Sequence, residues 1–257
     1  MPRPRVILLR APGTNCDEET AFAWEKAGAK VEPVHVNRLI ESPGRLAEFQ
    51  ILTIPGGFSY GDDLGAGRIL ATHLELALGA ELTRFHDRGG FILGICNGFQ
   101  VLVRAGLLPG GIRDRPATLA HNESGRFEAR WVKLAPTPGL SPFVRFDEPI
   151  ELPVAHGEGR FLTSMADDLD RLTTTGQVVL HYCDQQGRPT ESYPANPNGS
   201  PGGAAALCDP TGRIMGLMPH PERYVEPWHH PRWSRSKARP KQGDGMRIFT
   251  AATTAWQ

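Results

Sequence analysis

The stretch Gly89–Gly106, GGFILGICNGFQVLVRAG, predicts a strand, a sharp turn and a helix in direct succession. The apolar run FILGI is typical of a buried strand, and the run NGFQVLVRA favours a short helix. Between them, Gly94–Gly98 has the G-x-C-x-G form of a nucleophile elbow, in which small flanking residues let the sharp turn close. The thiol of Cys96 would then lie at a helix N-terminus, where the helix dipole and free N–H groups favour the thiolate.

Predicted strands and helices alternate along the first half of the chain. Apolar runs predict strands at Arg5–Leu9, Lys30–Val36, Ile51–Ile54 and Phe91–Ile95. Helical patterns fall at 18–29, Ile69–Asp87 and Asn97–Ala105. We expect Asp17 to be the N-cap of the first helix, and Pro33 suggests that the second strand lies at a sheet edge. The alternation predicts an α/β fold, with an open, mostly parallel sheet flanked by helices on both faces.

The second half of the chain has a different composition. Residues 115–200 are richer in Pro, Gly and short strand-like runs such as RWVKL and VVLHYC, which indicates β-rich insertions or antiparallel strands. Residues 192–203 read as a surface loop. The runs AAALCD and RIMGLM predict two strands joined by a turn at Asp209–Gly212, and Gly243–Trp256 predicts a closing helix. We expect a single domain over residues 1–257.

Composition excludes several classes of protein. Lys and Arg together number 28, as do Asp and Glu, so no broad basic face for nucleic acid is expected. No run of 18 apolar residues is present, so no membrane span is expected. The four cysteines lie far apart and form no C-x-x-C motif, which argues against a disulfide scaffold or a metal site and favours a reducing, cytoplasmic location. They are Cys16, Cys96, Cys183 and Cys208.

A second candidate elbow precedes the first along the chain. Gly57–Gly61, GFSYG, matches the G-x-S-x-G motif of serine hydrolases. The residues that follow it, YGDDLGAG, are typical of a loop, and a helix is expected to begin only near Leu64 or Arg68. An elbow requires its helix immediately, so Cys96 is favoured over Ser59 as the nucleophile. A buried, inert thiol remains the alternative for Cys96.

The stretch GRIMGLMPHPERY suggests a base and its orienting carboxylate. Two prolines flank His220 and hold the chain extended, and in an extended chain side chains two residues apart share a face. Glu222 is therefore expected within reach of the His220 imidazole, where it could select the tautomer. The alternative is a loop histidine beside a solvated glutamate. The strand end before His220 could lie at the carboxyl edge of the sheet, near Cys96.

Backbone N–H groups could complete such a site. Gly56 and Gly57 end the third predicted strand, and a glycine-rich turn there can present N–H groups to an oxyanion. The expected donor pair is the N–H of Asn97, directly after the nucleophile, and one N–H from the Gly56–Phe58 turn. The residues thus predict acyl transfer by cysteine, histidine and glutamate.

At this point the chain resembles the class I glutamine amidotransferases, in particular glutaminase subunits of purine biosynthesis. The matching stretches are APGTNCD, IPGGFSYGDDLGAG, LGICNGFQVLVRAGLLPG, PVAHGEGRF, GLMPHPER and GDGMRIF. They span nearly the whole chain in the family's order. The resemblance implies a flavodoxin-like fold and a catalytic set of Cys96, His220 and Glu222. It also implies oxyanion or glutamine binding by Gly56, Gly57, Phe58, Asn97 and Gln100.

The same resemblance implies a division of labour between subunits. This chain would hydrolyse glutamine and pass the ammonia to a large, PurL-like synthetase subunit, with a small PurS-like subunit in the complex. The partner would use ATP and Mg²⁺ to convert formylglycinamide ribonucleotide to formylglycinamidine ribonucleotide. No cofactor or metal is expected on this chain, which lacks G-x-x-x-x-G-K-[ST]. The chain departs from the family at RAPGTNCD and at Tyr224–Gln242, which is longer than in compact members.

Other interpretations stay open. A serine or cysteine hydrolase that acts alone would share the catalytic set without needing a partner. A nucleic-acid-binding protein could use the basic, Trp-containing stretch HHPRWSRSKARPK, although a solvated surface beside an interface explains it more simply. A catalytically silent α/β relative is a third possibility. The stretch Pro153–Phe161, with His156, could face a partner or the ammonia path, or form a structural turn.

Overall fold

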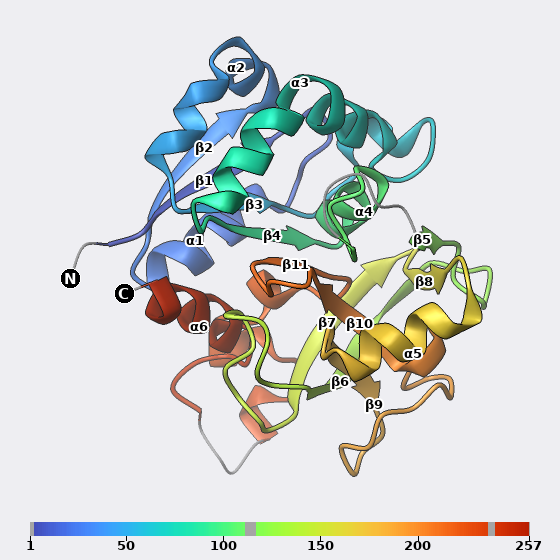
Figure 1. Cartoon of the computed structure of the whole chain (residues 1–257). Helices are drawn as coiled ribbons and strands as arrows, with labels where there is room; N and C mark the ends of the chain where they lie inside the picture. Colours follow the sequence, from blue (N-terminus) through green and yellow to red (C-terminus); the bar gives the residue numbers. More distant parts are fainter. Residues whose placement is uncertain (1–2, 111–116, 236–239, 257) are drawn as a thin grey trace.

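The computed structural model describes residues 3–110, 117–235 and 240–256. A large sheet of nine strands runs through these residues in the order β2-β1-β3-β4-β11-β10-β9-β6-β7 (Figure 1). Its strands are β1 Arg5–Arg10, β2 Lys30–His35, β3 Ile51–Ile54, β4 Phe91–Ile95, β6 Glu128–Pro136, β7 Ile150–His156, β9 Val178–Cys183, β10 Ala204–Cys208 and β11 Ile214–Leu217. A separate pair is formed by β5, Ala117–Ala120, and β8, Arg160–Thr163.

The sheet changes character between β11 and β10. The strands β2, β1, β3, β4 and β11 run parallel to one another, whereas β10 pairs antiparallel with β11 and the strands β10, β9, β6 and β7 are antiparallel to one another in turn. The predicted mostly parallel sheet and the β-rich second half are both confirmed. The predicted edge strand is also confirmed, because β2 ends the sheet.

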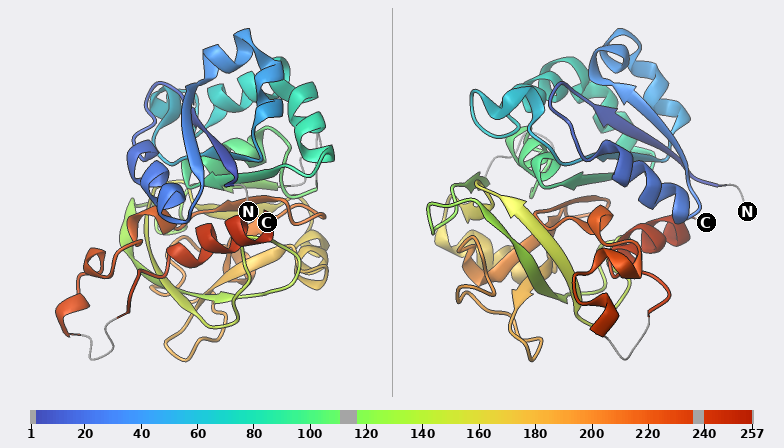
Figure 2. Two further views of the ribbon diagram at one scale, coloured as in Figure 1. Left: turned by 90° about the vertical axis from the view of Figure 1, so that its left-hand side faces the viewer. Right: turned by 180° about the vertical axis from the view of Figure 1, so that it is seen from behind.

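Helices cover both faces of the parallel part. They are α1 Asp17–Lys26, α2 Val36–Glu41, α3 Arg68–Asp87, α4 Asn97–Arg104 and α6 Met246–Trp256, whereas α5, Ala166–Thr174, contacts β8. Helix α1 contacts α6, where the rings of Trp24 and Phe249 meet edge to face with centroids 4.9 Å apart. Helix α3 packs against α4 on the opposite face (Figures 1 and 2). None of the helices in the described part of the chain is long and apolar enough to cross a membrane.

Two sequence expectations need correction. Asp17 is not the N-cap of α1: Cys16 holds that position, and the Asp17 carboxylate pairs with Arg10 Nε at 2.6 Å. The stretch 192–203 is only partly a surface loop, because the side chains of Asn196, Asn198 and Ser200 are buried. Composition misleads here since each of these polar side chains has hydrogen-bond partners that replace water.

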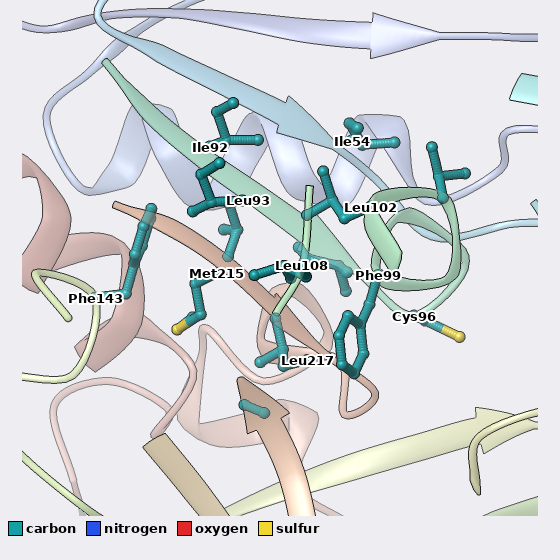
Figure 3. Packing of buried hydrophobic residues seen from close by; sticks show 14 of the residues in the cluster. Ile54, Ile92, Leu93, Cys96, Phe99, Leu102, Leu108, Phe143, Met215 and Leu217 are labelled. Carbon is teal, nitrogen blue, oxygen red and sulfur yellow. The ribbon is translucent and has the colours of Figure 1, made fainter. Parts of the chain in front are cut away.

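The core is closely packed where α4 crosses β4 and β11. Phe99 of α4 lies over Gly216 of β11 so closely that a Cβ on that glycine would come within 2.1 Å of the ring. Figure 3 shows Ile92, Leu93 and Leu217 in this apolar cluster, with the Cys96 sulfur turned away from it at the end of β4. The packing of α4 against β4 and β11 therefore fixes the position of the turn that presents Cys96.

Candidate active site

Cys96 forms the sharp turn between β4 and α4 that its motif predicts. Its backbone has φ +50° and ψ −103°, a conformation that is rare for a residue with a side chain. Its N–H donates to the Leu217 carbonyl at 2.8 Å, which ties the turn to β11. Its side chain is only 6% exposed. A strained residue held by neighbouring structure is typical of functional sites.

Gly98 allows the helix to follow the turn at once. A Cβ at this position would lie 1.9 Å from the backbone oxygen of Ile54, the last residue of β3. No side chain fits there, because the contact is with backbone rather than with a movable group. Gly98 therefore sets how closely α4 approaches the sheet.

His220 and Glu222 meet as predicted. Their Nδ1 and Oε1 atoms are 2.6 Å apart, and both side chains are buried. The local conformation differs from the fully extended one expected, because Pro221–Arg223 forms a 3₁₀ turn. Strands β4 and β11 are parallel with Ile95 opposite Leu217, so Cys96 and His220 emerge at the same carboxyl edge.

The charges around His220 favour its protonated form. Burial lowers its pKa, but the Glu222 carboxylate and then Cys96 raise it, and the pKa ends well above its usual value. The Nε2 atom has no hydrogen-bond partner among the described residues. Cys96 and His220 can therefore form a thiolate–imidazolium pair, with Glu222 fixing Nδ1.

Ser59 is buried in a 3₁₀ turn over Ser59–Asp62, with no α-helix directly after it. Its N–H donates to Asn97 Oδ1 at 3.1 Å, while its hydroxyl has no partner among the described residues. The backbone of this turn is thus hydrogen-bonded to Asn97 of the Cys96 elbow. The Ser59 hydroxyl is not paired with a base, in agreement with the weaker match of its surroundings to an elbow.

Ser59→Ala should leave glutamine hydrolysis within about twofold of the wild type. It removes an unpaired buried hydroxyl, so the free energy of unfolding should be unchanged or rise by up to about 1 kcal/mol. Steady-state glutaminase kinetics and urea unfolding measure both quantities. A loss of about 10⁴-fold would instead identify Ser59 as a nucleophile.

Asn97 and Gln100 connect the elbow to its surroundings. Asn97 Nδ2 donates to Asp62 Oδ1 at 3.1 Å and to Gln100 Oε1 at 3.0 Å. Gln100 Nε2 donates to the Glu158 carbonyl at 2.6 Å. Burial raises the pKa of Asp62, while its hydrogen bonds from Gly67 and Asn97 oppose the shift. These contacts fix the loop at 57–67 against α4.

The glycine turn after β3 is shaped by close backbone contacts. A Cβ on Gly56 would come within 3.0 Å of His220 Cε1, and one on Gly57, where φ is +142°, within 2.8 Å of Gly13 O. The Phe58 N–H is already donated to Gly13 O at 2.9 Å. Among the described residues, the backbone N–H groups of Gly57 and Asn97 have no recorded acceptor, so this pair fits the expected oxyanion donors.

A pocket of about 250 Å³ opens onto Cys96. Its other lining residues are Gly57, Phe58, Asp62, Ala66, Gln100, His121, Phe127, Ala155, His156, Gly157 and Glu158. Gly56 lies beside His220 rather than in this lining. The structure therefore brings Gly57, Phe58 and Gln100 to one pocket with Cys96. The assignment of these residues to glutamine binding stays a prediction.

His156 is a buried histidine in the pocket wall that sequence reasoning left undecided. Burial lowers its pKa from 6.5 to about 4, and the charge of nearby His220 adds to the effect. Its ring is therefore neutral at physiological pH, and the unfolded chain binds a proton that the folded chain does not between pH 4 and 6.5.

Acidification from pH 7 to pH 5 should therefore destabilise the protein by about 2 kcal/mol through His156. The raised pKa of His220 has the opposite sign, because its imidazole holds its proton in the folded chain while the unfolded one gains it as the pH falls through 6.5, and this contribution is present in both proteins compared below. Urea unfolding of wild type and His156→Asn at both pH values isolates the effect. Equal pH dependence in the two proteins would contradict it.

Cys16 also reaches the site, which no local pattern predicts. Its Sγ, a His220 nitrogen and a Glu222 oxygen lie within 4.8 Å of one another, a spacing that could hold a metal ion. However, Glu222 already holds His220, and Arg223 Nη2 donates to Cys16 Sγ at 3.1 Å, which places a cation where a metal would bind. The contacts thus fit a catalytic pair of His220 and Glu222 better than a metal site. Cys16 packs beside this pair, next to Gly56.

In the segment Tyr224–Gln242, Tyr224 and Val225 are buried, and the 3₁₀ turns Pro227–His229 and Trp233–Arg235 then extend away from the body of the molecule (Figure 2). Its residues 236–239, which belong to the basic stretch, lie outside the described residues, as do residues 115 and 116. Trp228 and Trp233 are exposed, whereas Arg232 is neutralised by Glu151 at 2.9 Å. This pairing reduces the basic surface that binding to nucleic acid would need.

Comparison with known proteins gives a match over nearly the whole chain. Residues 3–256 match the model of the CobB/CobQ-like glutamine amidotransferase domain. The chain is 49% identical over 254 residues to the phosphoribosylformylglycinamidine synthase subunit PurQ of Dehalococcoides mccartyi, covering 98% of this chain and 97% of that protein. It is 42% identical over 245 residues to human phosphoribosylformylglycinamidine synthase, covering 88% of this chain and 18% of that protein.

A solved structure agrees in fold. The structure of PurLQS from Thermotoga maritima contains a chain that superimposes with a TM-score of 0.76 at 30% identity, covering 100% of both chains. The similarity to these proteins thus extends over nearly the whole chain. It includes the segments that form the sheet, the Cys96 elbow and the pair of His220 and Glu222.

Proposed function

Because the chain belongs to the CobB/CobQ-like glutamine amidotransferase family, we propose that it is the glutaminase subunit of phosphoribosylformylglycinamidine synthase. It hydrolyses glutamine to glutamate and ammonia for the amidation of formylglycinamide ribonucleotide. The observation that carries this function is the strained Cys96 elbow at the same sheet edge as the His220–Glu222 pair, open to a pocket.

Catalysis begins with attack by the Cys96 thiolate on the side-chain carbonyl carbon of glutamine. The C–S bond forms, and the carbonyl π electrons move to oxygen. The N–H groups of Gly57 and Asn97 stabilise this oxyanion. His220, protonated at Nε2, gives its proton to the amide nitrogen as the C–N bond breaks, and ammonia leaves.

The γ-glutamyl thioester that remains is hydrolysed by water. His220, now neutral, takes a proton from the attacking water as the water oxygen bonds to the thioester carbon. The C–S bond then breaks and Cys96 leaves as thiolate, which restores the thiolate–imidazolium pair, and glutamate is released with its γ-carboxyl proton passing to solvent. Glu222 keeps Nδ1 protonated, so that Nε2 is the atom that exchanges protons at each step. The sequence of steps leaves the chain unchanged.

Ammonia must reach its acceptor without loss to water, and this requires a partner. We assign the amidation to a PurL-like synthetase subunit accompanied by a PurS-like subunit, with ATP and Mg²⁺ bound there. Two comparisons support such a complex. The Thermotoga maritima assembly is named PurLQS, with one letter each for L, Q and S, and the human synthase contains a similar region within a longer chain. We place the complex in the cytoplasm.

Isotope transfer tests the function. The full chain is combined with the synthetase subunits, ATP, Mg²⁺, formylglycinamide ribonucleotide and glutamine labelled with ¹⁵N in its side-chain amide. The label is expected in formylglycinamidine ribonucleotide, and omission of this chain should abolish the transfer. A product that acquires ¹⁵N only from added ammonium salt would refute the proposal.

A diazo-ketone analogue of glutamine tests the site in the same preparation. Mass spectrometry should find the adduct on Cys96 in stoichiometric amount, with protection by excess glutamine. An adduct on Ser59, or none, would remove Cys96 from its proposed role.

A further inference from the structure

The hydrogen bonds of Asn122 determine the tautomer of His156. Asn122 Nδ2 donates to the backbone oxygens of Arg126 and His156, each at 2.8 Å. The amide orientation is thereby settled, since only the NH₂ group can face two carbonyls. Asn122 Oδ1 is then an acceptor, and it receives the Gly159 N–H at 3.0 Å.

His156 Nδ1 lies 3.0 Å from the same Asn122 oxygen and must therefore donate to it. A neutral imidazole that donates from Nδ1 carries its lone pair on Nε2. Gly159 crowds the ring, since a Cβ there would come within 2.5 Å of Nδ1. Both the orientation of the ring and the position of its lone pair are thus set by the surrounding backbone.

The Nε2 lone pair has no donor in the described part of the chain. The side chain is 3% exposed, Nε2 makes no hydrogen bond, and His156 lines the same pocket as Cys96. A buried acceptor without a partner costs free energy of folding unless a ligand satisfies it. The atom therefore indicates a ligand that brings a hydrogen-bond donor.

Two carboxylates in the pocket wall already have donors or cations. Asp62 Oδ1 accepts from Gly67 N–H and Asn97 Nδ2, and the Glu158 carboxylate lies 3.6 Å from Arg104 Nη2. His156 Nε2 differs from these carboxylate oxygens because it is neutral and receives no hydrogen bond from the described residues.

We propose that His156 Nε2 accepts an N–H of the glutamine side-chain amide and thereby selects glutamine over glutamate. The inference rests on the proposed glutaminase function. When the carbonyl oxygen of the amide points to the Gly57 and Asn97 N–H groups, its NH₂ group needs an acceptor elsewhere in the pocket. A γ-carboxylate has no hydrogen there, so two lone pairs would face each other, and a site built for a donor rejects a substrate that lacks one. The same repulsion helps the product glutamate to leave.

Two substitutions separate this role from a structural one. In His156→Asn the amide nitrogen can replace Nδ1 and keep the bond to Asn122, but the acceptor at Nε2 is lost. In His156→Gln the longer side chain can place an oxygen near the Nε2 position, but the bond to Asn122 is lost. We expect kcat/KM for glutamine to fall by about 10- to 100-fold in His156→Asn and to stay within about fivefold in His156→Gln.

Thermal stability at pH 7.5 should show the reverse order, with His156→Asn close to wild type and His156→Gln less stable. His229→Asn, an exposed position in the projecting segment, should match wild type in both measurements. Activity that follows stability across the two His156 variants would show a structural role and overturn the proposal.

Binding gives a second readout. In a Cys96→Ala background, calorimetry should show the preference for glutamine over glutamate reduced at least about tenfold by His156→Asn and largely retained by His156→Gln. An unchanged preference in His156→Asn would overturn the inference. If the wild-type chain, alone and with its synthetase, fails to hydrolyse glutamine, the proposed function itself fails, so the two failures are distinguishable.

Discussion

Cys96→Ala should reduce glutamine hydrolysis by at least about 10⁴-fold, because no other group in the pocket can form the thioester. Alanine also carries a Cβ, so the backbone at φ +50° faces the same steric demand and the elbow should keep its shape. Synthesis driven by added ammonia in the assembled complex should continue at the wild-type rate. Both reactions are measured on one preparation, by glutamate release and by product formation.

Cys183→Ala is the matched control for Cys96→Ala. Cys183 is also buried, and burial raises the pKa of its thiol to about 11, as expected for an inert cysteine. The control should retain glutaminase activity. Substantial glutamine hydrolysis by Cys96→Ala would mean that the nucleophile is misassigned, and loss of the ammonia reaction would mean that the substitution disturbs the complex instead.

Gly98→Ala should both destabilise the protein and impair its chemistry. The added methyl group would overlap the Ile54 carbonyl oxygen, so α4 must move away from β3 or the elbow must distort. We expect the free energy of unfolding to fall by about 3 kcal/mol or more. Displacement of the Cys96 thiol and the Asn97 N–H by about 1 Å should lower kcat/KM by about 100-fold.

Gly79→Ala provides the contrast for Gly98→Ala. Gly79 lies within α3, and its nearest neighbour to an added Cβ is Leu74 O at 3.9 Å. Alanine there should stabilise the helix by up to about 1 kcal/mol and leave activity unchanged. Urea unfolding and glutaminase kinetics compare the two variants. Equal stability of Gly98→Ala and wild type would show that the contact with Ile54 is not restrictive.

Local patterns predicted the parts of the site that depend on neighbours in sequence. The elbow at Cys96 follows from a strand, small residues and a helix in succession, and Glu222 reaches His220 because it lies two positions further along the chain. The choice of Cys96 over Ser59 likewise followed from what comes directly after each residue. Such locally encoded features are retained in the folded chain because few distant contacts can override them.

The remaining parts depend on contacts between distant segments. Cys16 lies behind Gly56 because the β1–α1 loop folds over the end of β3, and His156 is oriented by Asn122. Neither contact leaves a periodic pattern in the sequence. The same reason explains why the buried asparagines of residues 192–203 read as surface.

The position of β11 also has a consequence for biosynthesis. This strand lies between β4 and β10 in the sheet, yet it leaves the ribosome after the other eight strands of that sheet (Figure 1). Until it emerges, β4 lacks one of its neighbours, the Cys96 N–H lacks the Leu217 carbonyl, and His220 does not yet exist. A nascent chain that has not yet released β11 therefore carries a dormant thiol, and glutamine hydrolysis begins only when β11 and His220 have emerged and this long-range pairing has closed.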